Sequence, residues 1–467
     1  MSNDLKENKK SISSVIVWQV IGKIIVQGIA FFSARIFTRM LTSDDYGQYS
    51  SFMSWVAVVG IVIGLQADGT LRIARKRFDD KEYSGYCSSV LFLSLCVYLI
   101  IQFLLIIFQK PLGILLRFPS HIIPLIAIFS FTVFAVTFFS TKLEFDLKVE
   151  KKVLISVIVA VFGFLLSIYL VNGFNELKYS GRIIGTLIPS VIASVFIIIA
   201  VFRGGRDIVN KKHWGLCLNF SVPLMFHVGA AIILSQSDII MLKHYVNESE
   251  TGVYGVVYSL AIILSSLWDA FNRAWVPFYN DLKKRDDTVQ IISKSKGYRF
   301  LFTSITMCFL LCAPEVFKFI AEESYWGGLT VIPLIACTYY IDFLWSFPEN
   351  FEFYNENTKL ISVATIISAV INIILNIILI PRFRIVGAAA ATVASYFVCF
   401  TIHDICARFV IKRYEYNWGF YILGIIPVVI CCFIYYLGMP YVLLRWLLAL
   451  IIGAVALCRI IKQRSIF

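Results

Sequence analysis

The sequence predicts an all-α polytopic membrane protein with about 14 transmembrane helices. Three observations indicate this fold class: the composition, the recurrence of long apolar stretches, and the sorting of basic residues into alternate loops. Of the 467 residues, 59% are hydrophobic and only 15% are charged. A water-soluble core of this size could not bury so much apolar surface, so the excess must face lipid. We therefore expect an integral membrane protein with no separate soluble domain.

The apolar stretches recur along the whole chain, with interruptions of roughly 5 to 20 residues. Each stretch approaches the length of about 20 residues that a helix needs to cross the hydrocarbon. About a dozen polar residues precede the first stretch without an obvious cleavage site, so we expect the first span to be retained. The predicted spans lie near residues 13–34, 48–66, 87–108, 121–141, 153–172, 183–202, 216–237, 253–275, 299–320, 330–354, 361–380, 386–407, 419–437 and 442–460.

Cysteine usage and motif content argue against bound cofactors. Nearly all of the 11 cysteines lie inside apolar stretches, where a thiol behaves as a small hydrophobe. The chain has no CxxC pair and no Gly-x-x-x-x-Gly-Lys motif. We therefore expect no cofactor, no metal and no ATP hydrolysis, so that an ion gradient or consumption of the product would supply the driving force.

The net charge of +13 is explained by topology. Basic residues gather in every second loop, which the positive-inside rule assigns to the cytoplasm, and an even number of spans then places both termini there. The distribution argues against a nucleic-acid partner. The basic class includes Arg75, Lys81, Lys142, Lys148, Lys151, Arg203, Lys212, Lys283, Lys412 and Arg464, whereas the opposite loops hold Arg39, Lys110, Arg117, Lys178, Lys243 and Arg382.

A sequence echo predicts an internal repeat. The segments RMLTSDDYGQYSSF (39–52) and IMLKHYVNESETGVYGVVYS (240–259) both pass from Met-Leu through a polar acidic turn to Gly-x-Tyr. Six predicted spans separate the two copies, and this even offset gives them the same orientation in the membrane. A parallel repeat about an axis along the membrane normal is therefore expected. Chance similarity of short turn motifs is the alternative.

With these motifs the chain resembles the polysaccharide flippases of the multidrug/oligosaccharidyl-lipid/polysaccharide exporter superfamily, the O-antigen and capsule repeat-unit transporters. Residues 34–49 (ARIFTRMLTSDDYGQY) are similar to that family's opening signature. Residues 220–242 (FSVPLMFHVGAAIILSQSDIIML) look like its proline-containing helix ending in Ser-Gln-x-Asp, and residues 382–395 (RFRIVGAAAATVAS) look like its Gly-Ala-Ala helix start. The resemblance covers nearly the whole length, and the motifs are specific only in this order and spacing.

The resemblance implies two six-helix lobes around a central cavity, followed by two further helices. The expected domains are residues 1–205, 206–410 and 411–467. It also implies alternating-access export of an undecaprenyl-diphosphate-linked oligosaccharide to the outer leaflet of a bacterial cytoplasmic membrane. Membrane lipids, a polysaccharide polymerase and a chain-length regulator would be the partners.

A polar stripe marks the first span. Gln19, Lys23 and Gln27 recur every four residues and therefore share one face of an otherwise apolar helix. Such a stripe must face water or protein, because an ionisable group at the bilayer centre costs roughly 2.5 to 3.5 kcal/mol. We expect these residues to line the substrate cavity, with packing between helices as the alternative.

The eighth span carries a second polar set. Asp269, Asn272 and Arg273 lie at steps of three and four residues and could form one surface. The resemblance favours a cationic cavity, and a diphosphate needs fixed positive charge once it leaves the headgroup region. Two alternatives remain: Arg273 anchors its helix at the cytoplasmic face, or Asp269 and Arg273 neutralise one another.

Carboxylates within predicted spans are candidates for proton or sodium coupling, because a carboxylate can bind an ion on one side and release it on the other. The candidates are Asp238, Asp342 and Glu349. Asp238 lies close to a predicted span end, and so does Glu352, which follows Glu349 in the sequence. An interfacial position is therefore the alternative for Asp238 and Glu352.

Two other functions compete with the flippase. A membrane-embedded enzyme such as a polysaccharide polymerase would show a large polar loop or an acid/base cluster, and the longest predicted loop, about residues 276–298, has no convincing constellation. We therefore do not expect an enzyme. A drug or cation antiporter of the same superfamily would favour an acidic, aromatic cavity, whereas Lys23 and Arg273 indicate an anionic ligand.

Overall fold

Helices make up every element of the computed structural model, which describes residues 2–174 and 176–463. The side chains of residues 2–17, 19, 20, 358 and 463 lie outside the described part. This confirms the predicted fold class. The chain divides into two compact units, residues 1–252 and 253–467, and each is described by itself.

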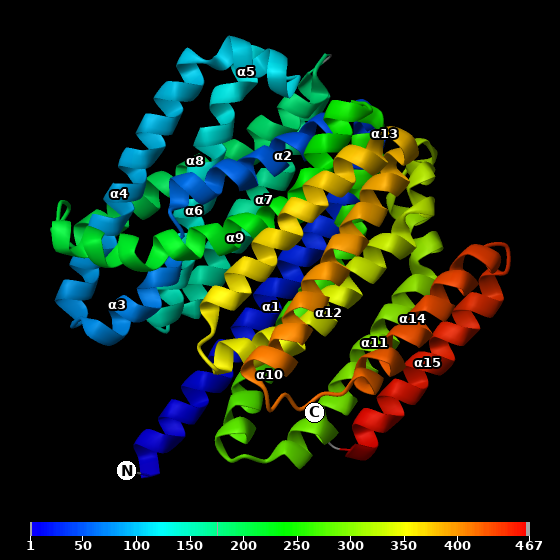
Figure 1. Ribbon diagram of the computed structural model, residues 1–467. Helices are drawn as coiled ribbons and strands as arrows, with labels where there is room; N and C mark the ends of the chain where they lie inside the picture. Colours follow the sequence, from blue (N-terminus) through cyan, green and yellow to red (C-terminus); the bar gives the residue numbers. More distant parts are fainter. Residues whose placement is uncertain (1, 175, 464–467) are drawn as a thin grey trace. The chain divides into compact units, whose positions relative to one another are not determined.

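The first unit contains nine α-helices and the start of a tenth among its described residues (Figure 1). Two short helices, α3 and α5, lie in segments that were expected to be loops. The helices are α1 (Ser2–Met40), α2 (Ser43–Gly64), α3 (Leu71–Arg77), α4 (Asp80–Ile107), α5 (Gln109–Leu116), α6 (Ile123–Phe145), α7 (Val149–Gly173), α8 (Lys178–Gly204), α9 (Lys211–Tyr245) and α10 (Glu248–Lys284), with 3-10 turns η1 (Ala67–Thr70) and η2 (Ser120–Ile122).

The second unit takes up α10 and continues to the described end of the chain. Its remaining elements are α11 (Thr288–Ile320), the 3-10 helix η3 (Glu323–Thr330), α12 (Ile332–Tyr354), α13 (Thr358–Ile405), the π-helix η4 (Cys406–Ile411), α14 (Trp418–Leu437) and α15 (Val442–Gln463).

Twelve described helices are long and apolar enough to cross a membrane, and a thirteenth candidate is the pair η3 and α12, which is bent by 54°. The candidates include one segment of 53 residues, 359–411. At 1.5 Å per residue a straight helix of that size would be about 80 Å long, whereas the hydrocarbon core is about 30 Å thick. This segment therefore cannot be one straight crossing.

The long helix α13 is broken at Arg384, whose backbone angles are φ 54° and ψ −130°. A Cβ atom at Gly387 would lie 2.3 Å from the Leu379 carbonyl oxygen, so the chain folds back on itself here. Figure 1 shows α13 as two legs, yellow and orange, that run in opposite directions. The break falls between the predicted spans 361–380 and 386–407. If each leg of α13 is counted separately and the bent pair of η3 and α12 is counted as one span, the total is fourteen. That number stays a prediction.

The expected loop over residues 276–298 is wrong. Helix α10 continues to Lys284 and α11 begins at Thr288, with Asp287 accepting a hydrogen bond from the Gln290 N–H at 3.0 Å as an N-cap. Charged side chains end the apolar stretch without ending the helix, because Lys, Arg and Glu are good helix formers. Hydropathy therefore located the ends of the apolar stretches and not the ends of the helices.

The sequence echo appears as equivalent local structure at the starts of α2 and α10. The Thr42 hydroxyl accepts from the Asp45 N–H at 3.2 Å, and the Asn247 side chain accepts from the Glu250 N–H at 2.9 Å, so both helices have an N-cap at the same place in the motif. The two copies also touch. A Cβ at Gly47 would lie 1.8 Å from the Glu248 carbonyl oxygen, and a Cβ at Gly252 would lie 1.9 Å from that of Ser43.

This contact is self-complementary, because each glycine meets the first residue of the helix formed by the other copy. Glycine is required at both places, since any side chain would overlap backbone. The hydroxyls of Ser43 and Ser249 are also hydrogen bonded at 2.7 Å. The local structure thus agrees with an internal repeat, while the arrangement of whole lobes stays a prediction.

A second repeat is visible in the sequences Arg-Ile-Ile-Gly (182–185) and Arg-Ile-Val-Gly (384–387). Both glycines allow close contact with the preceding helical segment. A Cβ at Gly185 would lie 2.4 Å from the Ser167 Cα, so the backbones of α7 and α8 meet there. Small residues at such contacts are typical of membrane helix pairs.

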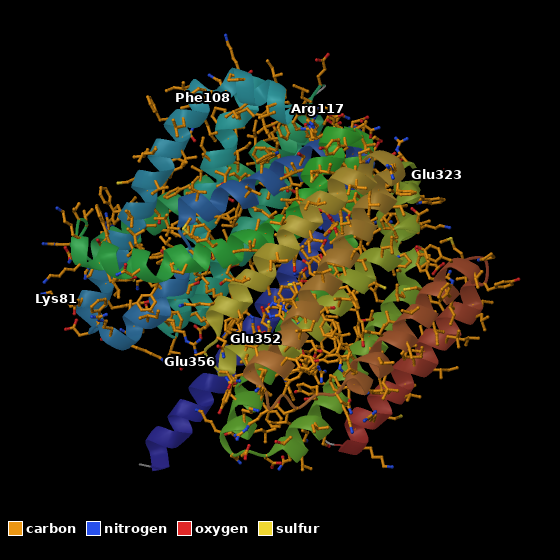
Figure 2. The ribbon with its side chains drawn as sticks, in the orientation of Figure 1. Lys81, Phe108, Arg117, Glu323, Glu352 and Glu356 are labelled. Carbon is orange, nitrogen blue, oxygen red and sulfur yellow. The ribbon has the colours of Figure 1, made fainter. Side chains whose placement is uncertain are left out.

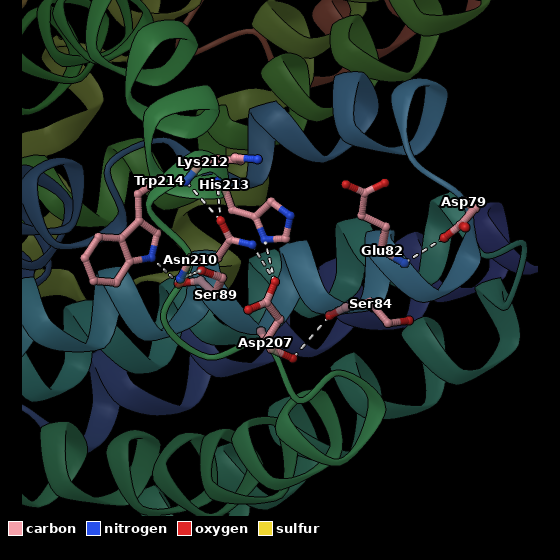
Figure 3. Close-up of polar contacts among 10 residues, drawn as sticks. Asp79, Glu82, Ser84, Ser89, Asp207, Asn210, Lys212, His213 and Trp214 are labelled. Atoms are coloured by element: carbon pink, nitrogen blue, oxygen red, sulfur yellow. Dashed lines mark hydrogen bonds and ion pairs between the residues drawn. The ribbon is translucent and has the colours of Figure 1, made fainter.

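Helix α9 packs within the first unit. The segment that precedes it, residues 205–210, lies against α4, and a Cβ at Gly205 would be 2.2 Å from the Ser84 carbonyl oxygen. Figure 3 shows the polar contacts that fasten this segment. The Trp214 indole donates to the Ser89 carbonyl at 3.0 Å, and the His213 ring lies 3.6 Å from the Asp207 carboxylate. The predicted boundary near residue 205 therefore differs from the break in compactness at 252, and the division into lobes stays a prediction.

Candidate functional site

The polar stripe of α1 lies in the first unit. Lys23 and Gln27 are both half-buried, and each has an interaction partner. Beside Lys23, Gly22 packs tightly on Val153 of α7, because a Cβ there would lie 2.7 Å from the valine Cγ1. The side chain of Gln19 lies outside the described residues. The described part of the stripe is thus next to the contact between α1 and α7, and its role as cavity lining stays a prediction.

The polar set of α10 lies in the second unit and forms an ion pair. The Arg273 Nε lies 3.1 Å from the Asp269 carboxylate, with side chains 71% and 41% exposed respectively. Asn272 accepts a hydrogen bond from the Asn350 amide of α12 at 3.0 Å. The mutual neutralisation considered from the sequence is therefore present in this structure. Asn272 ties two helices together.

The three candidate coupling carboxylates belong to two helices, α9 and α12. Asp238 belongs to α9 in the first unit and is fully buried, with its Oδ1 accepting from the Ile239 N–H at 2.8 Å. Asp342 and Glu349 are half-buried on α12 in the second unit, seven residues apart and therefore on one face of the helix. Asp238 and Glu352 are both buried within the protein, and the interfacial alternative for both stays open. Proximity to a span end in sequence does not measure burial.

Sequence reasoning missed a buried pair in the second unit. His403 Nδ1 lies 2.5 Å from Glu352 Oε2, and both side chains are 0% exposed. The remaining polar atoms, His403 Nε2 and Glu352 Oε1, have no hydrogen-bond partner among the described residues. Figure 2 shows Glu352 at the same end of α12 as Glu356. The available signal was an ionisable residue, His403, inside the predicted span 386–407.

Sequence reasoning also missed two buried cations in the first unit. Arg182 is 6% exposed, and its guanidinium carbon lies 4.4, 4.6 and 3.8 Å from the ring centroids of Phe37, Tyr46 and Tyr49. Contacts of this kind stabilise a cation that water no longer solvates. The Arg182 Nη1 is buried without a hydrogen-bond partner among the described residues. An arginine so placed keeps donor capacity for an anion.

Lys243 was expected in a loop on the outer side; the structure places it in helix α9, and the side of the membrane stays a prediction. It lies near the end of α9, is 2% exposed, and donates a hydrogen bond to the Gln48 side chain at 2.7 Å. Its ammonium also lies 3.1 Å from the Phe118 ring centroid, and Arg117 donates to its carbonyl at 3.0 Å. Helix α9 extends two turns beyond the predicted span 216–237, so Lys243 packs against α2 instead of reaching water.

The first unit thus holds fixed positive charge among helices, and the second unit holds a carboxylate-rich helix, α12. Fixed cations suit the recognition of phosphate-containing groups, and buried carboxylates suit ion binding. Among the described residues, no group of three or more His, Cys, Asp or Glu side chains could hold a metal ion.

Comparison with solved structures places this fold among known transporters. A lipid II flippase, MurJ, in an inward closed conformation superposes with a TM-score of 0.73 over 96% of this chain and 99% of that one, at 14% sequence identity. An inward-facing multidrug resistance MATE family transporter of the MOP superfamily gives 0.62 over 84% of this chain and 98% of that one, at 13% identity. At such identities these likenesses show the fold alone.

Sequence comparison gives relatives of two kinds. The Lsg locus putative protein 1 of Haemophilus influenzae is 29% identical over 39% of this chain and 47% of its own length. The chain spans about half the length of the two Haemophilus relatives that it matches. A probable low-salt glycan biosynthesis flippase, Agl15, of Haloferax volcanii is 22% identical over 85% of this chain and 84% of its own length.

Residues 14–283, more than half of the 467, match the family described as polysaccharide biosynthesis protein. The predicted resemblance to polysaccharide flippases is thereby confirmed at the level of family and fold. This chain belongs to the polysaccharide biosynthesis protein family.

Proposed function

We propose that this protein is a flippase that moves a lipid-linked oligosaccharide repeat unit from the cytoplasmic to the outer leaflet for surface polysaccharide synthesis. The observation that carries the proposal is the match of nearly the whole chain to the fold of a lipid II flippase, together with family membership. The substrate would be an undecaprenyl-diphosphate-linked oligosaccharide of O-antigen or capsule type, moved by alternating access. Transport, and no catalytic step, is the proposed activity.

The chemistry of the substrate explains why cations belong among the helices. A diphosphate leaving the headgroup region loses its hydration, and charge-assisted hydrogen bonds from Lys or Arg replace it. Lys23 on α1 is the proposed contact, with Gln19 and Gln27 on the same stripe for the sugars. Arg273 remains a candidate in the second unit, together with Asp269 and Asn272. Its ion pair with Asp269 would have to open before it could bind phosphate.

Ion coupling is proposed for Asp238, Asp342 and Glu349. Asp342 and Glu349 share a face of α12, and Glu352, whose partner His403 belongs to α13, follows on α12. Buried carboxylates can bind protons or sodium on one side of the membrane and release them on the other. The proposed setting is a bacterial cytoplasmic membrane, with both termini in the cytoplasm and a polymerase and chain-length regulator as downstream partners.

One observation favours a second function, a drug or cation antiporter. The fold also matches a multidrug transporter, with a TM-score of 0.62, and the carboxylates of α12 would suit a cationic substrate. The two functions make opposite predictions for Lys23. Removing the Lys23 cation weakens the binding of an anionic substrate. The same change leaves the binding of a cationic substrate unchanged or strengthens it.

Export of lipid-linked repeat units in a deletion strain tests the proposal. The deletion is complemented with the wild type, Lys23→Ala, Lys23→Arg or the control Lys110→Ala, whose side chain is exposed on α5. Surface polysaccharide is measured together with the lipid-linked repeat unit that accumulates. Lys23→Ala should reduce export about tenfold or more, the cost of one charge-assisted hydrogen bond.

The variants Lys23→Arg and Lys110→Ala should retain export. The further variant Lys23→Glu reverses the charge. Normal export by both Lys23→Ala and Lys23→Glu would refute the contact between Lys23 and the substrate diphosphate. If the deletion itself changes drug resistance and leaves polysaccharide unchanged, the antiporter is correct and the flippase proposal fails.

A further inference from the structure

A large apolar groove lies on the first unit between α6, α7 and α8. Its volume is about 880 Å³, and every residue that lines it is apolar. Phe162 of α7 and Phe196 of α8 form part of the lining and are 60% and 68% exposed, so the groove is open to its surroundings. A cavity of this size without a polar group fits hydrocarbon chains better than a small polar molecule.

One end of the groove is closed by backbone contact. A Cβ at Gly181 would lie 3.0 Å from the Leu170 carbonyl carbon, and Gly185 meets the Ser167 backbone one turn later, so α7 and α8 leave no space between them there. The groove begins immediately beyond, at Ile188 and Pro189. Proline removes a backbone hydrogen bond at this point of α8. A molecule in the groove therefore has no passage along it toward the start of α8.

A small basic pocket of about 210 Å³ lies next to the other end of the groove. Phe139 and Ala200 line both cavities, so the two are adjacent. Three lysines and one carboxylate line the pocket, which gives a net charge of +2. Lys142 is paired with Asp146 at 2.6 Å. Lys148 and Lys151 are exposed.

The geometry points to a bound anionic glycerophospholipid, with its acyl chains in the groove between α6, α7 and α8 and its phosphate at Lys148 and Lys151. Lysines at the membrane surface attract anionic headgroups, and these two belong to the loop class expected on the cytoplasmic side, where such lipids are enriched. The lipid is a resident one and not the transported substrate, because the closed end of the groove gives its headgroup no route to the opposite leaflet. This site does not depend on the proposed transport activity.

The headgroup would also contact the start of the segment that leads to α9. Ser84 and Gly204 line the basic pocket, and Gly205, the next residue, packs on the Ser84 carbonyl. A phosphate in the pocket would therefore stabilise the attachment of residues 205–210 to α4. Binding of the lipid should raise the thermal midpoint of the protein, because a ligand that binds only the folded state stabilises it.

Lipid selectivity of the purified, delipidated full-length protein tests the headgroup contact. Binding of phosphatidylglycerol and phosphatidylcholine is measured by native mass spectrometry, and the thermal midpoint is followed with each lipid. We expect phosphatidylglycerol to bind more tightly. The double variant Lys148→Ala/Lys151→Ala should weaken its binding about tenfold or more. The control Lys110→Ala/Lys178→Ala removes the same charge from α5 and from the start of α8, which are expected on the opposite side of the membrane. This control should have no effect on lipid binding.

Filling the groove tests the position of the acyl chains. Ala193→Trp places a large ring in the lining, whereas Val195→Trp places the same ring on an exposed part of α8 outside the groove. Only Ala193→Trp should reduce lipid binding, and Ala193→Phe replaces it if the tryptophan variant does not elute as a single folded species.

Three outcomes would overturn the proposal. Equal binding by all variants would show ordinary boundary lipid without a site. Loss of binding in Ala193→Trp with no effect of the lysine variants would show a site without headgroup recognition. Displacement of phosphatidylglycerol by an equal concentration of a polyprenyl diphosphate, with the same dependence on Lys148 and Lys151, would identify the occupant as substrate lipid.

Discussion

Glu352 and His403 depend on each other, since both side chains are buried and their other polar atoms have no hydrogen-bond partner among the described residues. The Trp345 ring lies 5.3 Å from that of His403 and covers the pair. A buried polar group that loses its partner incurs its full desolvation cost, about 1 to 3 kcal/mol. The pair therefore constrains how α12 and α13 pack, whatever proton it carries.

We predict that His403→Ala destabilises the protein by about 1 to 3 kcal/mol, because Glu352 is left buried and unpaired. Thermal unfolding in detergent, followed by tryptophan fluorescence, measures the change. The double variant Glu352→Leu/His403→Phe should recover much of the loss, since it removes both polar groups. His244→Ala, at an exposed histidine of α9, is the control. Equal stability of His403→Ala and the wild type would show that the pair contributes nothing.

The sequence predicts a site residue when the interaction that places it is between residues close together in the chain. The stripe of Lys23 and Gln27 follows from helical periodicity alone, and the ion pair of Asp269 with Arg273 was anticipated because its partners are one turn apart. His403 was missed because its partner is 51 residues away in sequence. Lys243 was misplaced because its position depends on α9 extending past the apolar stretch.

At the scale of the element, small residues determine which helices touch. Gly47 and Gly252 meet the starts of each other's helices, and Gly185 allows α7 and α8 to meet. Both glycines of the sequence echo are explained by this contact. The echo was found from sequence because caps and close helix contacts require specific residue types, whereas the extent of α10 and α11 was not, because charged residues are compatible with either helix or loop.

We predict that Gly47→Ala and Gly252→Ala each reduce folded yield severely, because the added methyl group would overlap backbone at 1.8 and 1.9 Å. Gly28→Ala is the matched control, since nothing lies within 4 Å of a Cβ there and alanine favours a helix interior. Size-exclusion chromatography of fluorescent fusions measures the folded yield. Wild-type yield in both echo variants would show that the two copies do not pack as described.

At the scale of the whole molecule, the number of membrane crossings depends on how α13 is counted. The positive-inside pattern required two predicted spans between residues 361 and 407, and the structure breaks the helix at Arg384 between them. The sequence separated this segment of 53 residues into two spans, and Arg382 and Arg384 lie at the break between them. The glycine and the proline near it, Gly387 and Pro381, are the local signals.

We predict that a periplasmic alkaline phosphatase reporter fused after Arg384 is active and that one fused after Arg413 is inactive. Both results follow if the two legs of α13 cross the membrane separately and the chain begins in the cytoplasm. A green fluorescent protein reporter at the same two positions should give the opposite pattern. The same compartment for both positions would show that α13 crosses once or not at all.

The packing of α9 sets an order of events during synthesis. The helices α2 and α4 and the turn η1, against which it packs within the first unit, all precede it in the chain. By the time the ribosome has translated the last residues of α9, every one of these partners has already left the exit tunnel. Insertion of α9 therefore need not await the C-terminal half of the polypeptide, and a nascent chain stalled near residue 252 should already resist proteolysis within the segment 205–214.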